Sequence, residues 1–403
     1  MARIALVLDG ELSHYLQTFA LAQDIESHGH EVLYCGFPSA AEYVRSRGYT
    51  FVSVFSGVVP ASTTSAENAV VVSRLFGSLL KGEQDAALNG HVPDAFLTLS
   101  VFCTMALVLR YRFQKPVVLL RSHCAELRRR EEMHRMLSGE LAFLTGHLSG
   151  LMRLIDAPRM SIDEIVARVL EMPEIVIYPA SFFPPELRED KNLYYARNSG
   201  NHGPAEQRFS WEAFDPTRPI VYCSLGTRPD LGGRLSQEFH KCVIETFARQ
   251  QSLQLIMSTG KTRVTQAVRR ATGNVYVSDW VPQTEVLKRS DLVITHGGMG
   301  TVRECITAGV PMLVVPMIRD QFASARRVID LGIGVQGDIR TMTSGRLSDL
   351  IASVLNEKCY KSRVMELRAN FLDEKTPDVF EILQRVLELQ DPGELGGVIM
   401  GGS

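Results

Sequence analysis

A short apolar run, a glycine-rich turn and a helical pattern follow one another between residues 292 and 308. This order constrains the fold more than any other stretch of the chain. Residues 292–295 (LVIT) have the length and composition of a buried strand. The helical pattern over residues 299–308 ends at Gly309 and Pro311, which are ordinary helix-stop signals. A strand that passes through glycines into a helix is the building unit of parallel α/β sheets.

The turn itself has properties that suit an anion. Gly297, Gly298 and Gly300 let the backbone approach a ligand closely. The start of the following helix offers unpaired N–H groups and the positive end of the helix dipole, so a diphosphate is expected there. Glycines also close tight turns for backbone reasons alone, and the turn by itself is a weak indication.

Polar and aromatic side chains around this turn supply the other contacts that a nucleotide needs. The Trp280 ring can stack on a base, and Gln283 and Glu304 can bind ribose hydroxyls. His296 and Thr301 are placed to donate hydrogen bonds to phosphate oxygens. Taken alone, such a tryptophan is more often a packing residue than a base platform. The order and spacing of the whole set favour nucleotide binding.

A further pair of polar residues follows the next apolar run. Asp320 and Gln321 come after residues 312–315 (MLVV), so they are expected at the carboxyl end of a strand. Ligands of open parallel sheets bind at that end. These two residues therefore join the predicted site.

The set resembles the donor-binding signature of the family 1 glycosyltransferases, the nucleotide-sugar-dependent enzymes that glucosylate natural products, and especially their bacterial branch. The matching positions are Trp280, Val281, Gln283, His296, Gly297, Gly298, Gly300, Thr301, Glu304, Pro316, Asp320 and Gln321. The resemblance implies the GT-B architecture: two facing Rossmann-like, doubly wound α/β domains with a donor and acceptor cleft between them. It also implies a UDP-sugar or dTDP-sugar as co-substrate.

The amino-terminal end carries a second match. Residues 4–8 predict a strand, residues 16–25 a helix and residues 31–34 another strand. In the family a Gly-His pair followed by a proline precedes the first helix, and His14 matches the catalytic base of that pattern. Imidazole suits this role because its ordinary pKa lies near neutrality. The alternative is a histidine that is merely hydrogen-bonded near a helix start.

One departure from the family concerns the residue that orients this base. The usual pattern places an aspartate about five residues after a Pro-Asp pair, and here Leu99 occupies that position. Ser100, a hydrogen-bonded water or, less directly, His123 could replace the missing aspartate. The acceptor could also supply the orienting group. His14 could also work unaided on an acidic acceptor such as a phenol.

A third donor-side element is predicted at residues 220–227 (IVYCSLGT), an apolar strand run that ends in a turn of small residues. Such turns present N–H and hydroxyl groups to phosphate, and this one resembles a family loop. Ser224 and Thr227 are the candidate ligands. A simple turn at the end of a strand is the alternative.

Composition excludes several classes of protein. The chain has 403 residues, 45% hydrophobic and 22% charged, with a formal net charge of −2, which predicts two globular domains and no nucleic-acid partner. Its 7 cysteines include no C-x-x-C pair, which argues against a disulfide framework and a zinc cluster and favours a reducing, cytoplasmic setting. Neither a signal peptide nor a transmembrane span is expected.

The domain boundary is predicted from a polar, glycine-rich break. Residues 198–204 (NSGNHGP) carry this break, and the next strand starts near residue 219. We expect an acceptor-binding domain at 1–197, a linker at 198–218 and a nucleotide-sugar domain at 219–375. Within the remaining 376–403, the helix-like segment 379–389 resembles a family helix that crosses back to the first domain; it could instead pack on the second.

Residues 121–135 form a basic segment, in which three arginines at 128–130 stand beside two glutamates. Such runs usually form a solvated, ion-paired helix face. An acceptor-site flap or a patch for an anionic partner is the functional alternative.

Together these features predict an inverting glycosyltransferase that moves a sugar to a hydroxyl of a small lipophilic natural product of polyketide or phenol type. No metal is expected, since the chain contains no Asp-x-Asp motif. A nucleotide-sugar epimerase on the same fold and a non-catalytic relative are the alternatives. Either a monomer or a homodimer is compatible with the sequence.

Overall fold

The computed structural model describes residues 1–54, 76–82, 88, 91–155, 161–196, 209–226, 233–260, 273–318, 320–373 and 379–389. The chain divides into two compact units. One comprises Met1–Gly200 together with Lys375–Ser403, and the other comprises Asn201–Glu374.

The described part of the N-terminal unit contains a parallel sheet of seven strands. They are β1 (Arg3–Val7), β2 (Glu31–Gly36), β3 (Thr50–Ser53), β4 (Ala95–Leu99), β5 (Val117–Arg121), β6 (Glu174–Val176) and β7 (Leu193–Tyr195). Their spatial order is β3-β2-β1-β4-β5-β6-β7, so the direction of winding reverses between β1 and β4. Ligands of doubly wound sheets bind at the carboxyl ends of the strands at such a reversal.

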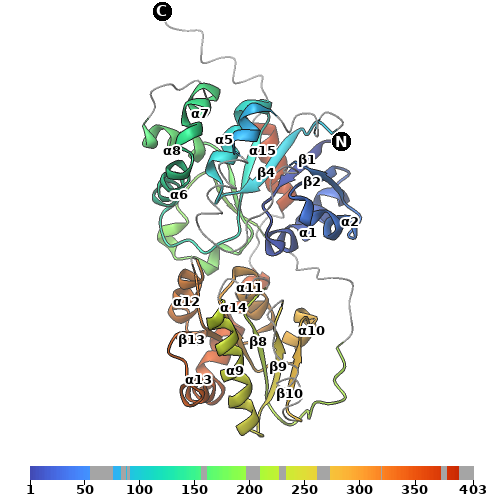
Figure 1. Ribbon diagram of the computed structural model, residues 1–403, viewed down its shortest axis with the longest axis vertical. Coiled ribbons are helices and arrows are strands. Elements are labelled where there is room, and N and C mark those ends of the chain that lie inside the picture. Colours follow the sequence, from blue (N-terminus) through green and yellow to red (C-terminus); the bar gives the residue numbers. More distant parts are fainter. Residues whose placement is uncertain are drawn as a thin grey trace, which may run out of the picture. The chain divides into compact units, whose positions relative to one another are not determined.

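Helices cover both faces of this sheet (Figure 1). They are α1 (Leu12–Ser27), α2 (Ala41–Arg45), α5 (Cys103–Phe113), α6 (Arg129–Phe143), α7 (Leu148–Leu154), α8 (Ile162–Leu170) and α15 (Val379–Leu389), with 3-10 turns at Pro38–Ala40, Thr145–His147, Ala180–Phe182 and Pro185–Leu187.

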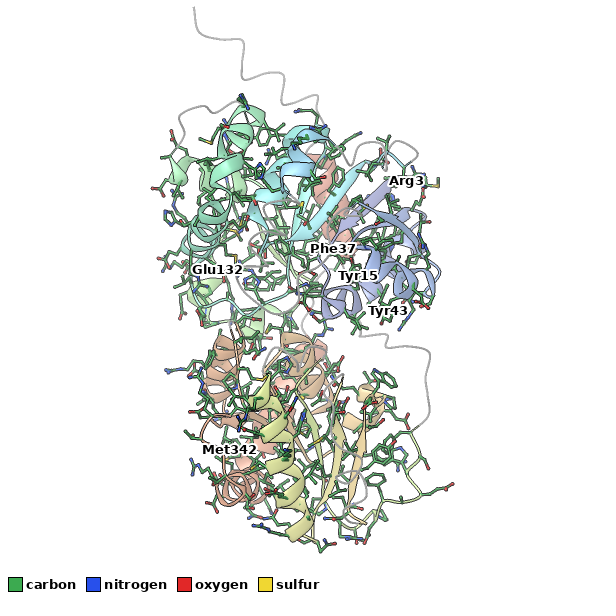
Figure 2. All side chains as sticks on the ribbon, viewed as in Figure 1. Arg3, Tyr15, Phe37, Tyr43, Glu132 and Met342 are labelled. Atoms are coloured by element: carbon green, nitrogen blue, oxygen red, sulfur yellow. The ribbon has the colours of Figure 1, made fainter. Side chains whose placement is uncertain are left out.

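The pattern of β1 shows why its residues form a central strand. Ile4 and Leu6 belong to one buried cluster, which includes residues of α1, α2 and α15, and Ala5 belongs to the other, with residues of α5, α6 and α8. Tyr15 and Phe37, labelled in Figure 2, belong to the first and second cluster respectively. Because both faces are buried, the strand reads as a continuous apolar run and not as an alternation.

The helix α15 packs on α1 although the two helices are far apart in the chain; Phe380 and Asp24, which are hydrogen-bonded, are 356 positions apart. The Phe380 N–H donates to an Asp24 oxygen at 3.2 Å, and the Phe380 ring stacks on His28 with centroids 4.1 Å apart. Val379 and Ile382 are buried in the cluster that contains α1. In Figure 1 this helix, drawn in red, lies among the blue and cyan elements of the N-terminal unit.

The C-terminal unit has a second parallel sheet, with six strands in its described residues. They are β8 (Ile220–Ser224), β9 (Gln254–Ser258), β10 (Val275–Ser278), β11 (Leu292–Thr295), β12 (Met312–Val314) and β13 (Gly334–Gln336). The order β10-β9-β8-β11-β12-β13 reverses between β8 and β11. The helices are α9 (Arg234–Arg249), α10 (Gln283–Leu287), α11 (Met299–Ala308), α12 (Gln321–Asp330), α13 (Ser344–Asn356) and α14 (Lys358–Asp373).

The predicted fold class, two doubly wound α/β units, is confirmed. The helix predicted at residues 299–308 coincides with α11, and Gly309 caps it in the left-handed conformation at φ +70°. The first helix begins at Leu12, four residues before the predicted start. The predicted start was too late because the polar first turn has the composition of a loop. His14 therefore lies inside the helix and not before it.

No helix in the described ranges is both long enough and apolar enough to cross a membrane.

Candidate active site

The two loops at the reversal of the C-terminal sheet meet at the imidazole of His296. One loop follows β8 and contains Gly226, and the other follows β11 and contains Gly298. A Cβ atom added at Gly226 would lie 2.5 Å from Cε1 of His296, and one added at Gly298 would lie 2.7 Å from its Nε2. The ring is therefore packed between two glycines, and neither position has room for a side chain.

The environment of His296 determines its charge. Burial lowers the pKa of this histidine to about 4, so the imidazole is neutral at neutral pH. A neutral imidazole still donates one N–H to an acceptor such as a phosphate oxygen. Donation to phosphate by His296 remains a prediction, and the mechanism it implies is a neutral hydrogen bond and not a fixed positive charge.

The absence of a side chain at Gly297 lets the turn pack closely against the neighbouring elements. Its φ is +90°, and a Cβ there would lie 2.8 Å from Cγ1 of Val314 and 3.2 Å from the backbone oxygen of Gln321. The Gln321 side-chain oxygen accepts the N–H groups of Met317 at 2.9 Å and Ile318 at 3.1 Å. Gln321 therefore secures the loop after β12 against which the glycine turn packs.

Gln283 and Glu304, which are both predicted ribose ligands, are hydrogen-bonded to each other. Nε2 of Gln283 donates to Oε2 of Glu304 at 2.5 Å and lies 3.4 Å from Oγ1 of Thr301. Oε1 of Gln283 accepts from the Tyr222 hydroxyl at 2.9 Å. Burial raises the pKa of Tyr222, so its phenol stays protonated and fixes the orientation of the amide.

Tyr222 was not among the residues selected from the sequence. It lies on β8 two residues before Ser224, so both side chains point to the same face of the sheet. Its spacing of two residues from Ser224, a predicted phosphate ligand, was the sequence signal that could have identified Tyr222 as part of the site.

The other residues predicted to bind the donor differ in exposure and contacts. Trp280 follows β10 with 41% of its surface exposed, which leaves its ring accessible for stacking, whereas Val281 is buried. Asp320 precedes α12, and its side chain does not cap that helix. Ser224 Oγ accepts the N–H of Gly226 at 3.3 Å. Thr227 lies outside the described residues.

In the N-terminal unit, His14 contacts an aspartate that follows β1. Its Nδ1 lies 2.7 Å from Oδ1 of Asp9, and the two side chains are 21% and 20% exposed. The N–H of Glu11 donates to the same Asp9 oxygen at 3.1 Å. Sequence reasoning missed Asp9, although a carboxylate directly after a strand and five residues before a candidate base was a usable signal.

Comparison with known proteins gives one family match and several relatives. Residues 254–389 match the family model of the erythromycin biosynthesis protein CIII-like C-terminal domain. The NDP-glycosyltransferase YjiC of Bacillus subtilis (strain 168) is 32% identical over 212 residues, which are 52% of each chain. The oleandomycin glycosyltransferase of Streptomyces antibioticus is 24% identical over 200 residues, 50% of this chain and 45% of that protein. The chain thus spans about half the length of the curated relatives it matches.

A solved structure matches over nearly the whole chain. The glycotransferase of kitacinnamycin superposes with a TM-score of 0.80 at 25% identity, covering 96% of this chain and 99% of the other. The calicheamicin glycosyltransferase CalG4, at 20% identity and a TM-score of 0.76 over the same shares, supports the fold alone. The chain is thus similar in fold to GT-B natural-product glycosyltransferases.

The departure from the family pattern at Leu99 has a structural description. Leu99 is 1% exposed and belongs to an apolar cluster. Oγ of Ser100 is buried and has no hydrogen-bond partner among the described residues. His123 lies 3.2 Å from Glu132. In the described residues, therefore, neither Ser100 nor His123 is hydrogen-bonded to His14, so neither suggested replacement is supported.

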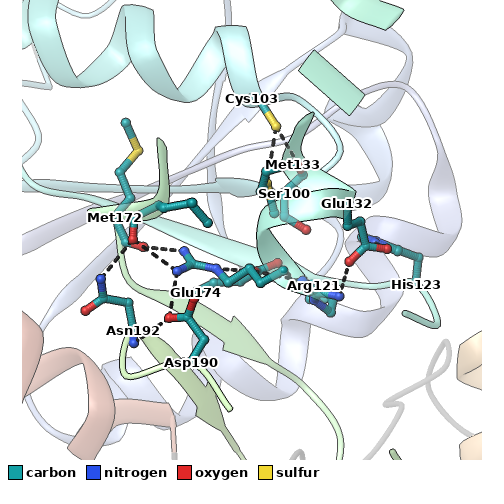
Figure 3. Close-up of polar contacts among 12 residues, drawn as sticks. Ser100, Cys103, Arg121, His123, Glu132, Met133, Met172, Glu174, Asp190 and Asn192 are labelled. Atoms are coloured by element: carbon teal, nitrogen blue, oxygen red, sulfur yellow. Dashed lines mark hydrogen bonds and ion pairs between the residues drawn. The ribbon is translucent and has the colours of Figure 1, made fainter. Parts of the chain in front are cut away.

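Part of the basic segment is engaged in buried polar contacts, and Figure 3 shows Arg121 among its acidic partners. Arg121 forms ion pairs with Glu132 and, at 3.0 Å, with Glu174. Arg129 contacts Glu174 at 2.8 Å and Asp190 at 3.1 Å. Burial alone would raise the pKa of Glu174, but the two guanidinium groups hold that pKa at about 2.

The expectation of a solvated helix face is therefore wrong for Arg121 and Arg129, whose side chains are only 3% and 2% exposed. It holds for Arg130 and Arg135, which form exposed ion pairs. The buried pairs connect α6 to β5 and β6, and removing one partner would leave an uncompensated buried charge.

Proposed function

We propose that the protein is an inverting glycosyltransferase that moves a sugar from a nucleoside-diphosphate sugar to a hydroxyl of a small lipophilic acceptor. The observation that carries this proposal is the meeting of the β8 and β11 loops at His296, next to the first turn of α11. The hydrogen-bonded pair of Gln283 and Glu304 adds a ribose site on the same unit. The similarity to the erythromycin biosynthesis protein CIII-like C-terminal domain and to the glycotransferase of kitacinnamycin supports the same conclusion.

The donor contacts follow from the chemistry of these groups. The amides at the start of α11 and the helix dipole suit the diphosphate, with neutral hydrogen bonds from His296 and Thr301. Glu304 accepts hydrogen bonds from the ribose, and Trp280 provides a surface for the base. Stacking suits uracil and thymine equally, so UDP-sugars and dTDP-sugars are both candidate donors.

In the proposed reaction, His14 removes the proton from the acceptor hydroxyl as its oxygen attacks the anomeric carbon of the sugar. The new bond forms opposite the diphosphate, whose bond to that carbon breaks with both electrons. The helix start, His296 and Thr301 stabilise the departing negative charge. Attack from the opposite face inverts the configuration at the anomeric carbon.

The acceptor class is proposed from the relatives. The oleandomycin and kitacinnamycin enzymes are named for natural products. We therefore propose a polyketide-type or phenolic acceptor for this chain.

Nucleotide binding is the first test of the proposal. UDP or dTDP is expected to raise the melting temperature of the protein in a concentration-dependent way, because a ligand that binds only the folded state stabilises it. Glu304→Ala should weaken that binding by about 1.5–3 kcal/mol, the usual contribution of a hydrogen bond to a charged group.

Glu366→Ala is the matched control, because Glu366 is exposed on α14, where its carboxylate pairs with Arg363. It should leave nucleotide affinity unchanged. Incubating the sugar nucleotide without acceptor is the companion assay: conversion to a stereoisomer would identify an epimerase and exclude the transferase. No response to any nucleotide would also contradict the proposal.

Turnover is expected to be independent of added divalent metal. The chain contains no Asp-x-Asp motif. The amides at the helix start and uncharged hydrogen-bond donors can stabilise the negative charge of the departing diphosphate. Initial rates with and without excess EDTA should therefore agree. Loss of activity in EDTA, restored by Mg²⁺, would show that this part of the mechanism is wrong.

A further inference from the structure

The aspartate after β1 occupies the place where a base-orienting group is needed. The distance of 2.7 Å between Nδ1 of His14 and Oδ1 of Asp9 is typical of a charge-assisted hydrogen bond. An ionised carboxylate can only accept a hydrogen bond, so Nδ1 carries the proton of the neutral ring. The basic lone pair is consequently on Nε2.

Asp9 is itself held in position by the backbone. Its Oδ1 also accepts the N–H of Glu11 at 3.1 Å, and the preceding residue, Leu8, donates its N–H to Cys35 at 3.0 Å. The carboxylate lies just before the start of α1, a helix of 16 residues, where the positive end of the helix dipole favours a negative charge. The group is thus fixed and electrostatically supported.

The sheet register explains how β1 can supply a group otherwise expected from β4. Val7 is paired with Thr98 in the parallel ladder of these neighbouring strands. Asp9 and Ser100 therefore follow their strands at the same level, at the same edge of the sheet. Because Leu99 is packed in the apolar cluster, the end of β4 contributes no carboxylate here.

We propose that Asp9 is the positioning residue for His14 and takes the role that the family gives to an aspartate at the position of Leu99. This inference rests on the proposed transferase function. As the acceptor proton moves to Nε2 of His14, the ring becomes an imidazolium, and Asp9 stabilises that charge without taking the proton. It also keeps the ring in the tautomer that can accept a proton.

The kinetic test uses Asp9→Asn, which preserves side-chain shape and removes the charge. With aryl and alkyl alcohols as acceptors, kcat should fall at least about tenfold while the UDP dissociation constant stays unchanged. The loss should be larger for weakly acidic alcohols than for nitrophenols, since acidic acceptors need less help from a base. Asp9→Glu should recover part of the rate. Asp163→Asn, an exposed aspartate on α8, is the control and should have wild-type kinetics.

A second measurement does not depend on turnover. In wild-type protein labelled with ¹⁵N-histidine, the neutral His14 ring should show the Nδ1–H tautomer. An Nε2–H tautomer in wild-type protein would overturn the inference even if Asp9→Asn did not fold. If the wild type transfers sugar and the Asp9→Asn rate stays within about twofold of the wild-type rate for all acceptors, the inference is overturned. The proposed function would still stand in that case. Absence of transfer by the wild type would contradict the function itself.

Discussion

Replacing His14 with alanine is expected to lower kcat by about 10²- to 10⁴-fold, the usual contribution of a general base. The acceptor hydroxyl would then have to lose its proton to water during attack on the sugar. Donor binding should be nearly unchanged, because His14 belongs to the N-terminal unit and the proposed donor contacts belong to the C-terminal unit. Initial rates at saturating donor and calorimetric titration with UDP measure the two quantities separately.

His134→Ala provides the matched control for this experiment. His134 is exposed on α6 and contacts Ser138, so its loss should leave both kcat and UDP affinity at the wild-type level. A His14→Ala variant that turns over at the wild-type rate would remove His14 from the mechanism. A variant with weak UDP binding would show that its defect is not limited to the chemical step.

Gly226→Ala is expected to reduce nucleotide affinity by at least about tenfold. A β-carbon at this position would meet the His296 ring at 2.5 Å, so the imidazole or the loop after β8 must move. Gly226 also has φ +84°, where a residue other than glycine costs about 1–2 kcal/mol. Both effects act on the region to which we assign the diphosphate. Titration with UDP and thermal denaturation measure affinity and stability.

Gly48→Ala separates the steric effect from the backbone strain. Gly48 has φ +86°, and nothing lies within 4 Å of a Cβ placed there. This variant should lose a similar amount of stability through strain and retain full nucleotide affinity. If Gly226→Ala bound UDP as tightly as Gly48→Ala, the packing of His296 against Gly226 would have no part in donor binding.

Local sequence signals were sufficient to predict features that depend on a single stretch of the chain. The turn at residues 297–300 and the extent of α11 were predictable, because an apolar strand, glycines and a helix stop follow in direct order. The start of α1 was misplaced, because its first turn contains polar residues and no capping side chain. Burial on both faces gave the strands continuous apolar runs, which predicted parallel sheets.

Contacts between distant residues were not predictable from spacing. Arg121 and Arg129 are part of a basic run, yet they are buried because Glu174 lies opposite them on β6. The Tyr222 hydroxyl meets Gln283 at a sequence separation of 61 residues. Such pairings depend on strand order and register, and a single sequence contains no direct record of either.

The amino-acid sequence by itself determined the fold class, the glycine turn before α11 and the identity of most candidate ligands, because these follow from local hydrophobic periodicity and backbone freedom. Only the tertiary structure decided which groups work together: the Asp9 carboxylate on His14, Tyr222 behind Gln283, and two glycines around the His296 ring. Side-chain direction and loop convergence select those partners, and both arise only after the sheets have formed.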